Sequence, residues 1–448
     1  MRSKFILMAL AAALLAVAAL PARAILPIQQ WQTSSGARVY FVENHELPML
    51  DISLEFPAGS AYDAKGKSGV AGMTNRLVRT GTRDMNENDI ARRLADVGAI
   101  LSGRFDTDRA GLSLRTLSSD KERREALGIF ARILQQPVFP QDVLEREKGR
   151  LIGNLKEIDS RPGTIVSLAF YRLVYGDHPY GMRASGDVES VNKIGRDDVV
   201  EFHRRHYAAQ NSVLALVGDV TRAEAEAIAE QVTRGLPEPQ TAQPSLQPVA
   251  ELAKGVERTI AHPALQAHIM IGAPGISRDD RDYIPLYVGN FILGGGGFSS
   301  RITDEIRSKR GLAYSVTSYF HPLQQQGPFV VSLQTQRGQA GEAVGVVHKM
   351  LREFVKSGPT EQELHAAKQN IVGGFPLRID SNRKIHEYLA VIGFYRLPLS
   401  YLEDFVQKVE RVTVSDIRDA FRRRIDPERM VTVVVGPESS KSANAGGN

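Results

Sequence analysis

Apolar and polar residues alternate along several stretches of the N-terminal half, and this period of two predicts β-strands. The stretches are residues 25–42, 49–56, 108–117 and 212–217. Between them, apolar residues recur at helical spacing and predict amphipathic helices. These helices are expected over residues 68–77, 86–97, 121–134, 143–158 and 197–206. The order of the elements indicates an α+β unit, in which a mixed sheet carries helices on one face.

The same pattern returns in the C-terminal half. Residues 194–218 align without a gap with residues 412–436, so that Val217 falls on Val435. Such self-similarity indicates two copies of one α+β unit. Between the copies, residues 235–250 contain four prolines and no periodicity, which predicts an extended linker.

We therefore expect two homologous α/β-sandwich halves joined by a Pro-rich linker. The expected segments are a signal peptide at 1–24, an N-terminal half at 25–234, the linker at 235–250, a C-terminal half at 251–437 and a disordered tail at 438–448. Each half is long enough to bury a core of its own.

The first residues have the pattern of a secretory signal peptide. Arg2 and Lys4 precede an apolar run, and a cleavage pattern of small residues ends at Ala24. Cleavage near Ala24 would place the mature chain in the periplasm or outside the cell. No later apolar stretch reaches the length that crosses a membrane.

Charge and cysteine content exclude several classes of function. The formal net charge is +5, and removal of Arg2, Lys4 and Arg23 with the signal peptide lowers it by three. The charges form no long run of one sign, so no nucleic-acid-binding face is expected. The chain has no cysteine, which excludes a disulfide, a lipid-anchored cysteine and a thiol nucleophile.

A run of four glycines precedes a short helix and strand in the second half. The four residues are Gly294, Gly295, Gly296 and Gly297. Their backbone can approach a neighbour or ligand closely. No Gly-Lys-Ser/Thr follows them, so they are not a phosphate-binding loop. Ser300 is predicted to be the N-cap of a helix that ends at Gly311, and residues 312–320 are predicted to form a strand.

Arg307, near the end of this helix, and Tyr314, near the start of the strand, would lie close together if the helix turns directly into the strand. A guanidinium is a permanent cation and a phenol is a hydrogen-bond donor. Together they could hold a peptide carbonyl or a developing oxyanion. The alternative is a solvated arginine beside a core tyrosine, and spacing alone does not decide between the two.

The sequence SSRITDEIRSKRGLAYSV, which begins at Ser299, resembles the C-terminal-half signature of the pitrilysin/insulinase family of zinc metallopeptidases, the inverzincins. In that family an Arg and a Tyr seven positions apart contact the substrate backbone, and Arg307 and Tyr314 match both residues and their spacing. The stretches GVAGMTNRLVRTGT and HPYGMRASGDV also stand in the family's order. The resemblance implies a clamshell fold, in which two such halves pack with another pair into a closed shell.

The resemblance also shows that the family's metal motif is missing. The family binds zinc through His-x-x-Glu-His on one helix and a distant Glu. The aligned residues here are Gly72 and Arg76 for the histidines, Asn75 for the general base and Asn154 for the third ligand. Glycine has no ligand atom, arginine stays cationic, and asparagine cannot take a proton from water. We therefore expect no metal site and no bound cofactor in this chain.

Other candidate catalytic groups are weaker. His203 and His206 have a spacing that can bind a metal, but no third ligand is evident nearby, and they are interpreted as stacked surface histidines. His178, in His-Pro-Tyr-Gly, is expected to fix a turn. No Gly-x-Ser-x-Gly motif is present.

Three functional hypotheses follow. In the first, which the resemblance implies, the chain is the non-catalytic subunit of a periplasmic heterodimeric peptidase. A homologous partner that carries His-x-x-Glu-His would hold the zinc, while Arg307 and Tyr314 bind the substrate peptide and the glycine run lines the chamber. In the second, the chain is a structural or peptide-binding scaffold with no role in hydrolysis. An independent enzyme is a third possibility, but no nucleophile–base pair supports it.

Overall fold

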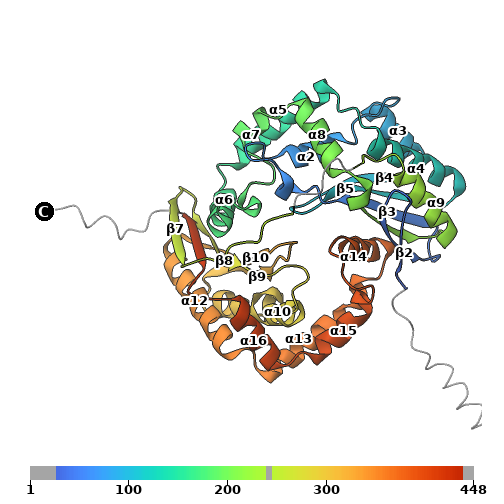
Figure 1. Ribbon diagram of the computed structural model, residues 1–448. Coiled ribbons are helices and arrows are strands. Elements are labelled where there is room, and N and C mark those ends of the chain that lie inside the picture. Colours follow the sequence, from blue (N-terminus) through green and yellow to red (C-terminus); the bar gives the residue numbers. More distant parts are fainter. Residues whose placement is uncertain (1–26, 239–244, 437–448) are drawn as a thin grey trace, which may run out of the picture.

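The computed structural model describes residues 27–238 and 245–436. The predicted signal peptide, the middle of the predicted linker and the predicted tail lie outside these residues. The described part forms two α/β halves that face each other, with the first half at the top of Figure 1 and the second at the bottom. None of its helices is long and apolar enough to cross a membrane.

The first sheet has six strands in the order β1-β2-β6-β3-β5-β4. They are β1 (Gln29–Gln32), β2 (Arg38–Glu43), β3 (Met49–Phe56), β4 (Ile100–Phe105), β5 (Ala110–Leu117) and β6 (Val213–Gly218). Strands β2 and β6 are parallel, and the other neighbours are antiparallel. The prediction of one strand over 25–42 was wrong, because a turn at Gly36, with φ of 86°, divides it in two.

The second sheet has five strands in the order β7-β11-β8-β10-β9. They are β7 (Val256–Ala261), β8 (Gln266–Pro274), β9 (Ala313–Phe320), β10 (Pro328–Gln336) and β11 (Val431–Gly436). Apart from β1, the order and the strand directions repeat those of the first sheet, with β7 and β11 as the parallel pair. The predicted fold class, two homologous halves with mixed sheets, is therefore confirmed.

Amphipathic helices cover one face of each sheet. In the first half these are α2 (Val70–Leu77), α3 (Glu87–Asp96), α4 (Asp120–Gln135), α5 (Gln141–Ile158), α7 (Val188–Asn192), α8 (Arg196–His206) and α9 (Arg222–Thr233). In the second half they are α10 (Tyr283–Asn290), α12 (Ala340–Ser357), α13 (Glu361–Gly374), α15 (Tyr401–Arg411) and α16 (Val414–Arg424). The predicted helices of the first half are all present, with bounds shifted by one or two residues.

Two further helices cross from one half to the other. Helix α6 (Pro162–Tyr175) follows α5 in the chain but packs on β8 and β11 of the second sheet, where Phe170 is fully buried. Helix α14 (Asn382–Phe394) belongs to the second half but packs on β2, β3 and β6 of the first sheet. Each half therefore covers the second face of the other's sheet. This exchange was not predicted from the sequence.

A buried carboxylate fixes the junction between the halves. Asp108 is fully buried and accepts hydrogen bonds from the hydroxyl groups of Tyr180 at 2.8 Å and Tyr395 at 2.9 Å. It also accepts one from the backbone N–H of Gln324 at 2.7 Å. Since Tyr395 and Gln324 belong to the second half, this one side chain ties the two halves together.

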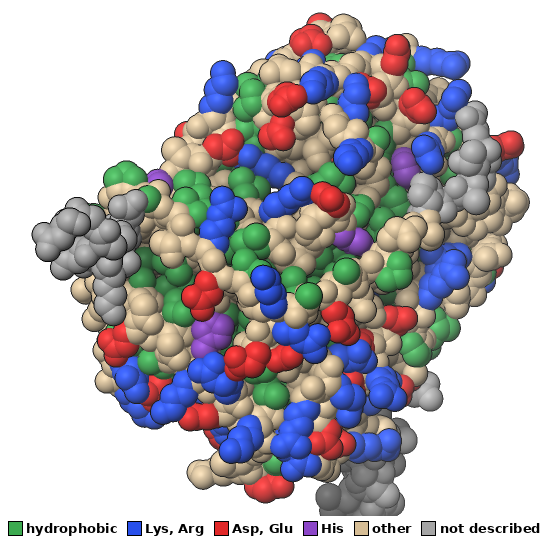
Figure 2. Space-filling view, turned by 60° about the vertical axis from the view of Figure 1, so that its left-hand side comes forward, with side chains coloured by type: hydrophobic (Ala, Val, Ile, Leu, Met, Phe, Trp, Pro, Cys, Tyr) green, Lys and Arg blue, Asp and Glu red, His purple; other side chains and the backbone are tan. Residues whose placement is uncertain are grey.

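The described end of the predicted linker packs against this junction. Leu246 and Val249 are buried with the side chains of α6, in residues that form neither helix nor strand. Elsewhere on the surface, basic and acidic side chains are interspersed on the face that Figure 2 shows, and hydrophobic side chains gather across its middle.

Candidate functional site

Arg307 and Tyr314 lie side by side on the second half. Arg307 belongs to the π-helical turn η6 (Asp304–Lys309), and Tyr314 is the second residue of β9. The Cζ atom of Arg307 lies 4.4 Å from the centroid of the Tyr314 ring, which is a cation–π distance. The same atom lies 4.5 Å from the centroid of the Phe298 ring. The guanidinium therefore contacts two aromatic rings.

Both rings are exposed to solvent. The exposed fraction is 80% for Tyr314 and 72% for Phe298. Gly297, just before Phe298, has a φ of 65°, a left-handed conformation that favours glycine. Large aromatic side chains at such exposure mark a surface that can bind another molecule.

Neighbouring acidic residues leave Arg307 unpaired. Asp304 forms an ion pair with Lys309 at 2.8 Å, and Glu305 forms one with Arg310 at 2.7 Å. Arg307 itself forms no ion pair with any side chain in the described part of the chain. Its N–H donors are available to a carbonyl oxygen or an oxyanion.

The helix that carries Arg307 differs from the predicted one. It has a single α-helical turn, α11 (Arg301–Thr303), followed by the wider turn η6. Ser300 lies at the predicted N-cap, but its hydroxyl donates to the carbonyl oxygen of Gly297 at 2.7 Å and does not accept from the helix. Gly311, with φ of 62°, ends the helix where the sequence predicted.

The glycine run packs closely against β9. A Cβ atom at Gly294 would lie 2.4 Å from the Oγ atom of Ser318, and one at Gly295 would lie 2.6 Å from the Nδ2 atom of Asn290. Gly296 is equally close to neighbouring backbone. These glycines are needed for packing, and the packed loop supports the exposed segment that carries Phe298.

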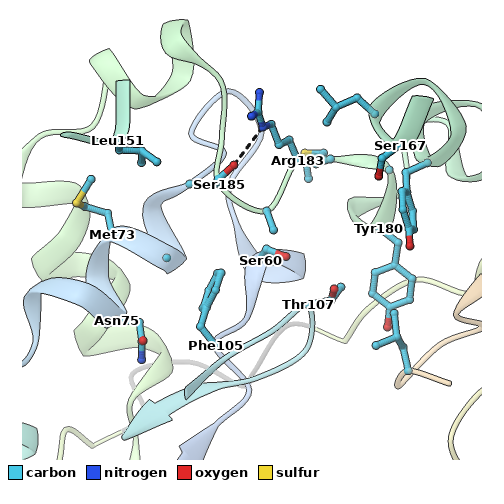
Figure 3. A pocket seen from close by; sticks show the side chains of 18 of the residues that line it. Ser60, Met73, Asn75, Phe105, Thr107, Leu151, Ser167, Tyr180, Arg183 and Ser185 are labelled. Atoms are coloured by element: carbon cyan, nitrogen blue, oxygen red, sulfur yellow. Dashed lines mark hydrogen bonds between the residues drawn. The ribbon is translucent and has the colours of Figure 1, made fainter. Parts of the chain in front are cut away.

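A second candidate region lies on α2. Gly72, Asn75 and Arg76 line a cavity of about 580 Å³ between the two halves (Figure 3). A Cβ atom at Gly72 would lie 3.3 Å from the ring of Phe105 on β4, so the ring takes the place beside this position. The Nδ2 atom of Asn75 donates to the carbonyl oxygen of Gly111 at 2.8 Å. Two of the three positions therefore serve packing and hydrogen bonding.

Arg76 is engaged in an ion pair with α5. Its guanidinium lies 3.2 Å from the carboxylate of Glu147, which also contacts Arg150 at 3.0 Å and Arg146 at 3.5 Å. Burial acts to raise the pKa of Glu147, but the guanidinium groups, first that of Arg76, outweigh it and lower the pKa. Asn154 lies two turns further along α5, where it is exposed and does not line the cavity.

These residues do not fit a zinc ion. Gly72 has no side-chain atom that could bind a metal, and Arg76 is a cation paired with Glu147. The side-chain amide of Asn75 donates a hydrogen bond to the backbone of β5. Throughout residues 27–238 and 245–436, no group of three His, Cys, Asp or Glu side chains is placed to hold a metal.

The histidines that the sequence singled out have structural roles. His203 and His206 are buried, so the interpretation as surface histidines was wrong. His203 stacks on Tyr207, and burial lowers the pKa of both histidines to about 4. His178 fixes a turn as predicted, because its ring accepts a hydrogen bond from the backbone N–H of Tyr180 at 3.1 Å.

Sequence reasoning missed two aromatic residues of these regions. Phe298 follows the glycine run directly, and an aromatic residue next to glycines that favour exposed loops was the available signal. Phe105 lies on β4, an edge strand that the sequence analysis did not predict. Nothing in the sequence shows that its ring lies beside Gly72, because the two residues belong to different elements.

Comparison with known proteins assigns both halves. Residues 38–187 match the family model described as "Insulinase (Peptidase family M16)", and residues 193–371 match "Peptidase M16 inactive domain". A Helicobacter pylori protein named "Non-peptidase homolog YmxG" is 27% identical over 89% of this chain and 91% of its own length.

Solved structures give the same assignment. The structure of a peptidase M16 inactive domain from Pseudomonas fluorescens is 39% identical and has a TM-score of 0.89, over 92% of this chain and 98% of that one. A protease from Helicobacter pylori has a TM-score of 0.86 at 19% identity, over 92% of this chain and all of that one, which shows the same fold. The chain therefore belongs to the insulinase family of peptidases, family M16.

Proposed function

We propose that this chain is the non-catalytic subunit of a periplasmic two-subunit zinc peptidase. The observation that carries the proposal is the state of Arg307, an unpaired cation in contact with two exposed aromatic rings. The positions aligned with the metal ligands have taken structural roles at Gly72, Asn75 and Arg76. The Helicobacter pylori relative, whose name calls it a non-peptidase homolog, supports the non-catalytic part.

In this proposal the two subunits divide the chemistry. The zinc site of a homologous partner supplies the activated water that attacks the scissile carbonyl. The guanidinium of Arg307 donates hydrogen bonds to the peptide carbonyl and then to the oxyanion that develops from it. The hydroxyl of Tyr314 donates a second hydrogen bond, and the ring of Phe298 limits the movement of the guanidinium.

The test begins with a secreted chain of similar length that carries His-x-x-Glu-His and is encoded beside this one. Each purified chain and their mixture are assayed with a quenched fluorescent peptide. We expect cleavage in the mixture alone, and a loss of about 10²- to 10³-fold in kcat for Arg307→Gln or Tyr314→Phe. Arg310→Gln is the matched control, because this arginine of the same segment is already paired with Glu305.

Three results would contradict the proposal. Equal cleavage by the partner alone would assign this chain to the scaffold hypothesis. Full activity of Arg307→Gln in the mixture would remove the proposed role of the pair. Cell fractionation that leaves the chain in the cytoplasm would remove the periplasmic location.

A further inference from the structure

The residues that line the cavity beside α2 suit a ligand that has both an apolar part and a negative charge. Its volume of about 580 Å³ is within the usual range for small-ligand sites. Apolar and aromatic side chains form much of the wall, from α2, β4, α5 and α6. The most prominent are Met73, Phe105, Leu151, Leu168 and Tyr171. Figure 3 shows Phe105 standing between Met73 on one side and Thr107 on the other.

The charged residues of this wall all have one sign. Arg76, Arg79 and Arg183 line the cavity, and no aspartate or glutamate among the described residues does. Arg76 is paired with Glu147 at 3.2 Å, and Arg183 is paired with Asp159 at 2.5 Å. Each of these two arginines therefore has a carboxylate partner, which in the case of Arg76 is shared with Arg146 and Arg150.

Arg79 differs from the other two arginines. It is half-buried, and within the described residues its guanidinium forms neither an ion pair nor a hydrogen bond, while Glu147 attracts it and Arg76 repels it from beyond ion-pair distance. Gly103, on the neighbouring strand β4, leaves the space in front of it open. A Cβ atom there would lie 3.7 Å from the Cζ atom of Arg79. An unpaired, partly desolvated cation at the wall of an apolar cavity favours an anionic ligand.

We propose that this cavity binds the C-terminal residue of a peptide, with its free carboxylate on Arg79 and an apolar or aromatic last side chain against the wall. A carboxylate and a guanidinium can form two parallel hydrogen bonds, which suits Arg79 better than a single-point contact. The hydroxyl groups of Ser60, Thr107, Ser167 and Ser185 also line the cavity. They can pair with peptide amide groups, whereas an alkyl chain offers them no partner.

The inference does not rest on the proposed subunit role. The cavity lies on the side of α2 and α6, and binding there requires neither a partner chain nor zinc. Arg307 is not among its lining residues. The proposed function could therefore fail while the cavity still binds peptides, and the reverse also holds.

The experiment measures binding of fluorescein-labelled Ala-Ala-Leu-Phe to the purified chain by fluorescence anisotropy. The matched probe is the same peptide with a C-terminal amide. We expect the acid to bind at least about tenfold more tightly than the amide, since a charged hydrogen bond is lost in the amide. Arg79→Gln should weaken the binding of the peptide acid by a similar factor. It should leave the affinity for the peptide amide unchanged. The control Arg92→Gln, which changes an exposed arginine outside the cavity, should leave the affinities of both peptides unchanged.

Clear results would overturn the proposal. These are equal affinity of the acid and the amide for the unmodified chain, or an Arg79→Gln variant that keeps full preference for the acid. Displacement of the probe by octanoate as effectively as by unlabelled peptide would show that the occupant is not a peptide. If Arg79→Gln does not fold, the comparison of acid and amide on the unmodified chain still decides.

Discussion

At the scale of single residues, the three positions of helix α2 that the resemblance aligns with the zinc motif make structural contacts. Asn75 holds the sheet through Gly111, Arg76 neutralises buried Glu147, and the missing side chain at Gly72 leaves room for Phe105. Restoring one histidine at a time would remove one of these contacts and would not complete a metal site. The residues present on α2 are therefore fixed by contacts with β4, β5 and α5.

The junction residue Asp108 allows the sharpest prediction at this scale. Its carboxylate accepts three hydrogen bonds, and an amide in its place has only one acceptor oxygen. We expect Asp108→Asn to lower the free energy of unfolding by about 1.5–3 kcal/mol, the usual value of a hydrogen bond to a charged group. Urea unfolding followed by circular dichroism measures the change.

A milder variant serves as the control for Asp108. Tyr395→Phe removes one donor from the second half and leaves two. Its cost should be smaller than that of Asp108→Asn, because the carboxylate keeps its bonds from Tyr180 and Gln324. If Asp108→Asn were as stable as the unmodified chain, Asp108 would not fix the junction.

Single-residue features were predictable where they depend on local spacing. The proximity of Arg307 and Tyr314 follows from a short helix, a glycine and a strand that are consecutive in sequence. The state of Arg79 could not be predicted, because it depends on Gly103 and on acidic residues that pair with other arginines. The same limit applies to the buried His203, which contacts Phe139 in the connection between α4 and α5.

At the scale of elements, the packing of the exchanged helices α6 and α14 could not be predicted from the sequence. A strand such as Met49–Phe56 was predicted to the residue, because its alternation is visible locally. Helix α6 is apolar around most of its circumference, which indicates burial but not the sheet that buries it. Which sheet a helix packs on depends on contacts between residues far apart in sequence, and the local periodicity does not show these contacts.

The tight packing of α14 predicts an unusual effect of alanine at Gly393. A Cβ atom there would lie 2.5 Å from the Cγ1 atom of Val213 and 2.7 Å from the ring of Tyr40. Alanine normally stabilises a helix by about 0.5–1 kcal/mol relative to glycine, but overpacking costs about 1–3 kcal/mol. We therefore expect Gly393→Ala to lower the free energy of unfolding, measured by urea titration.

The matched control lies in α12, on the outside of the second half. Gly345 is exposed, and a Cβ atom there would contact nothing within 4 Å. Gly345→Ala should therefore raise the free energy of unfolding by about 0.5–1 kcal/mol. Stabilisation by both substitutions would show that α14 does not pack on the first sheet as closely as described.

At the scale of the whole molecule, the exchange makes the two halves interdependent. Neither sheet has both faces covered by its own half, since α6 closes the second sheet and α14 the first. We expect the halves to unfold together, so that circular dichroism and the fluorescence of Trp31, on the first half, report a single transition. Separate transitions by these two probes would contradict the exchange.

Both halves also bury neutral histidines, which makes the stability of the molecule dependent on pH. Burial lowers the pKa of His203, His206 and His386 from 6.5 to about 4. Between these values the unfolded chain binds a proton at each histidine and the folded chain does not. Lowering the pH from 6.5 towards 4 therefore favours the unfolded state. Asp63 contributes to the pH dependence of stability with the opposite sign. Burial raises its pKa to about 7, so that below pH 7 the folded state binds a proton that the unfolded chain does not.

A single substitution separates these opposing contributions. The repeat places Phe421 of the second half at the position of His203, so His203→Phe installs a side chain that the fold already accepts there. Asp63 and the other titrating groups are common to the variant and the unmodified chain, and their contributions cancel in the difference. With pKa values of 6.5 and about 4, His203 accounts for a loss of about 2 kcal/mol between pH 7 and pH 5. Urea titrations at the two pH values should therefore show that His203→Phe loses about 2 kcal/mol less than the unmodified chain, and an equal loss in both would mean that His203 is protonated in the folded molecule.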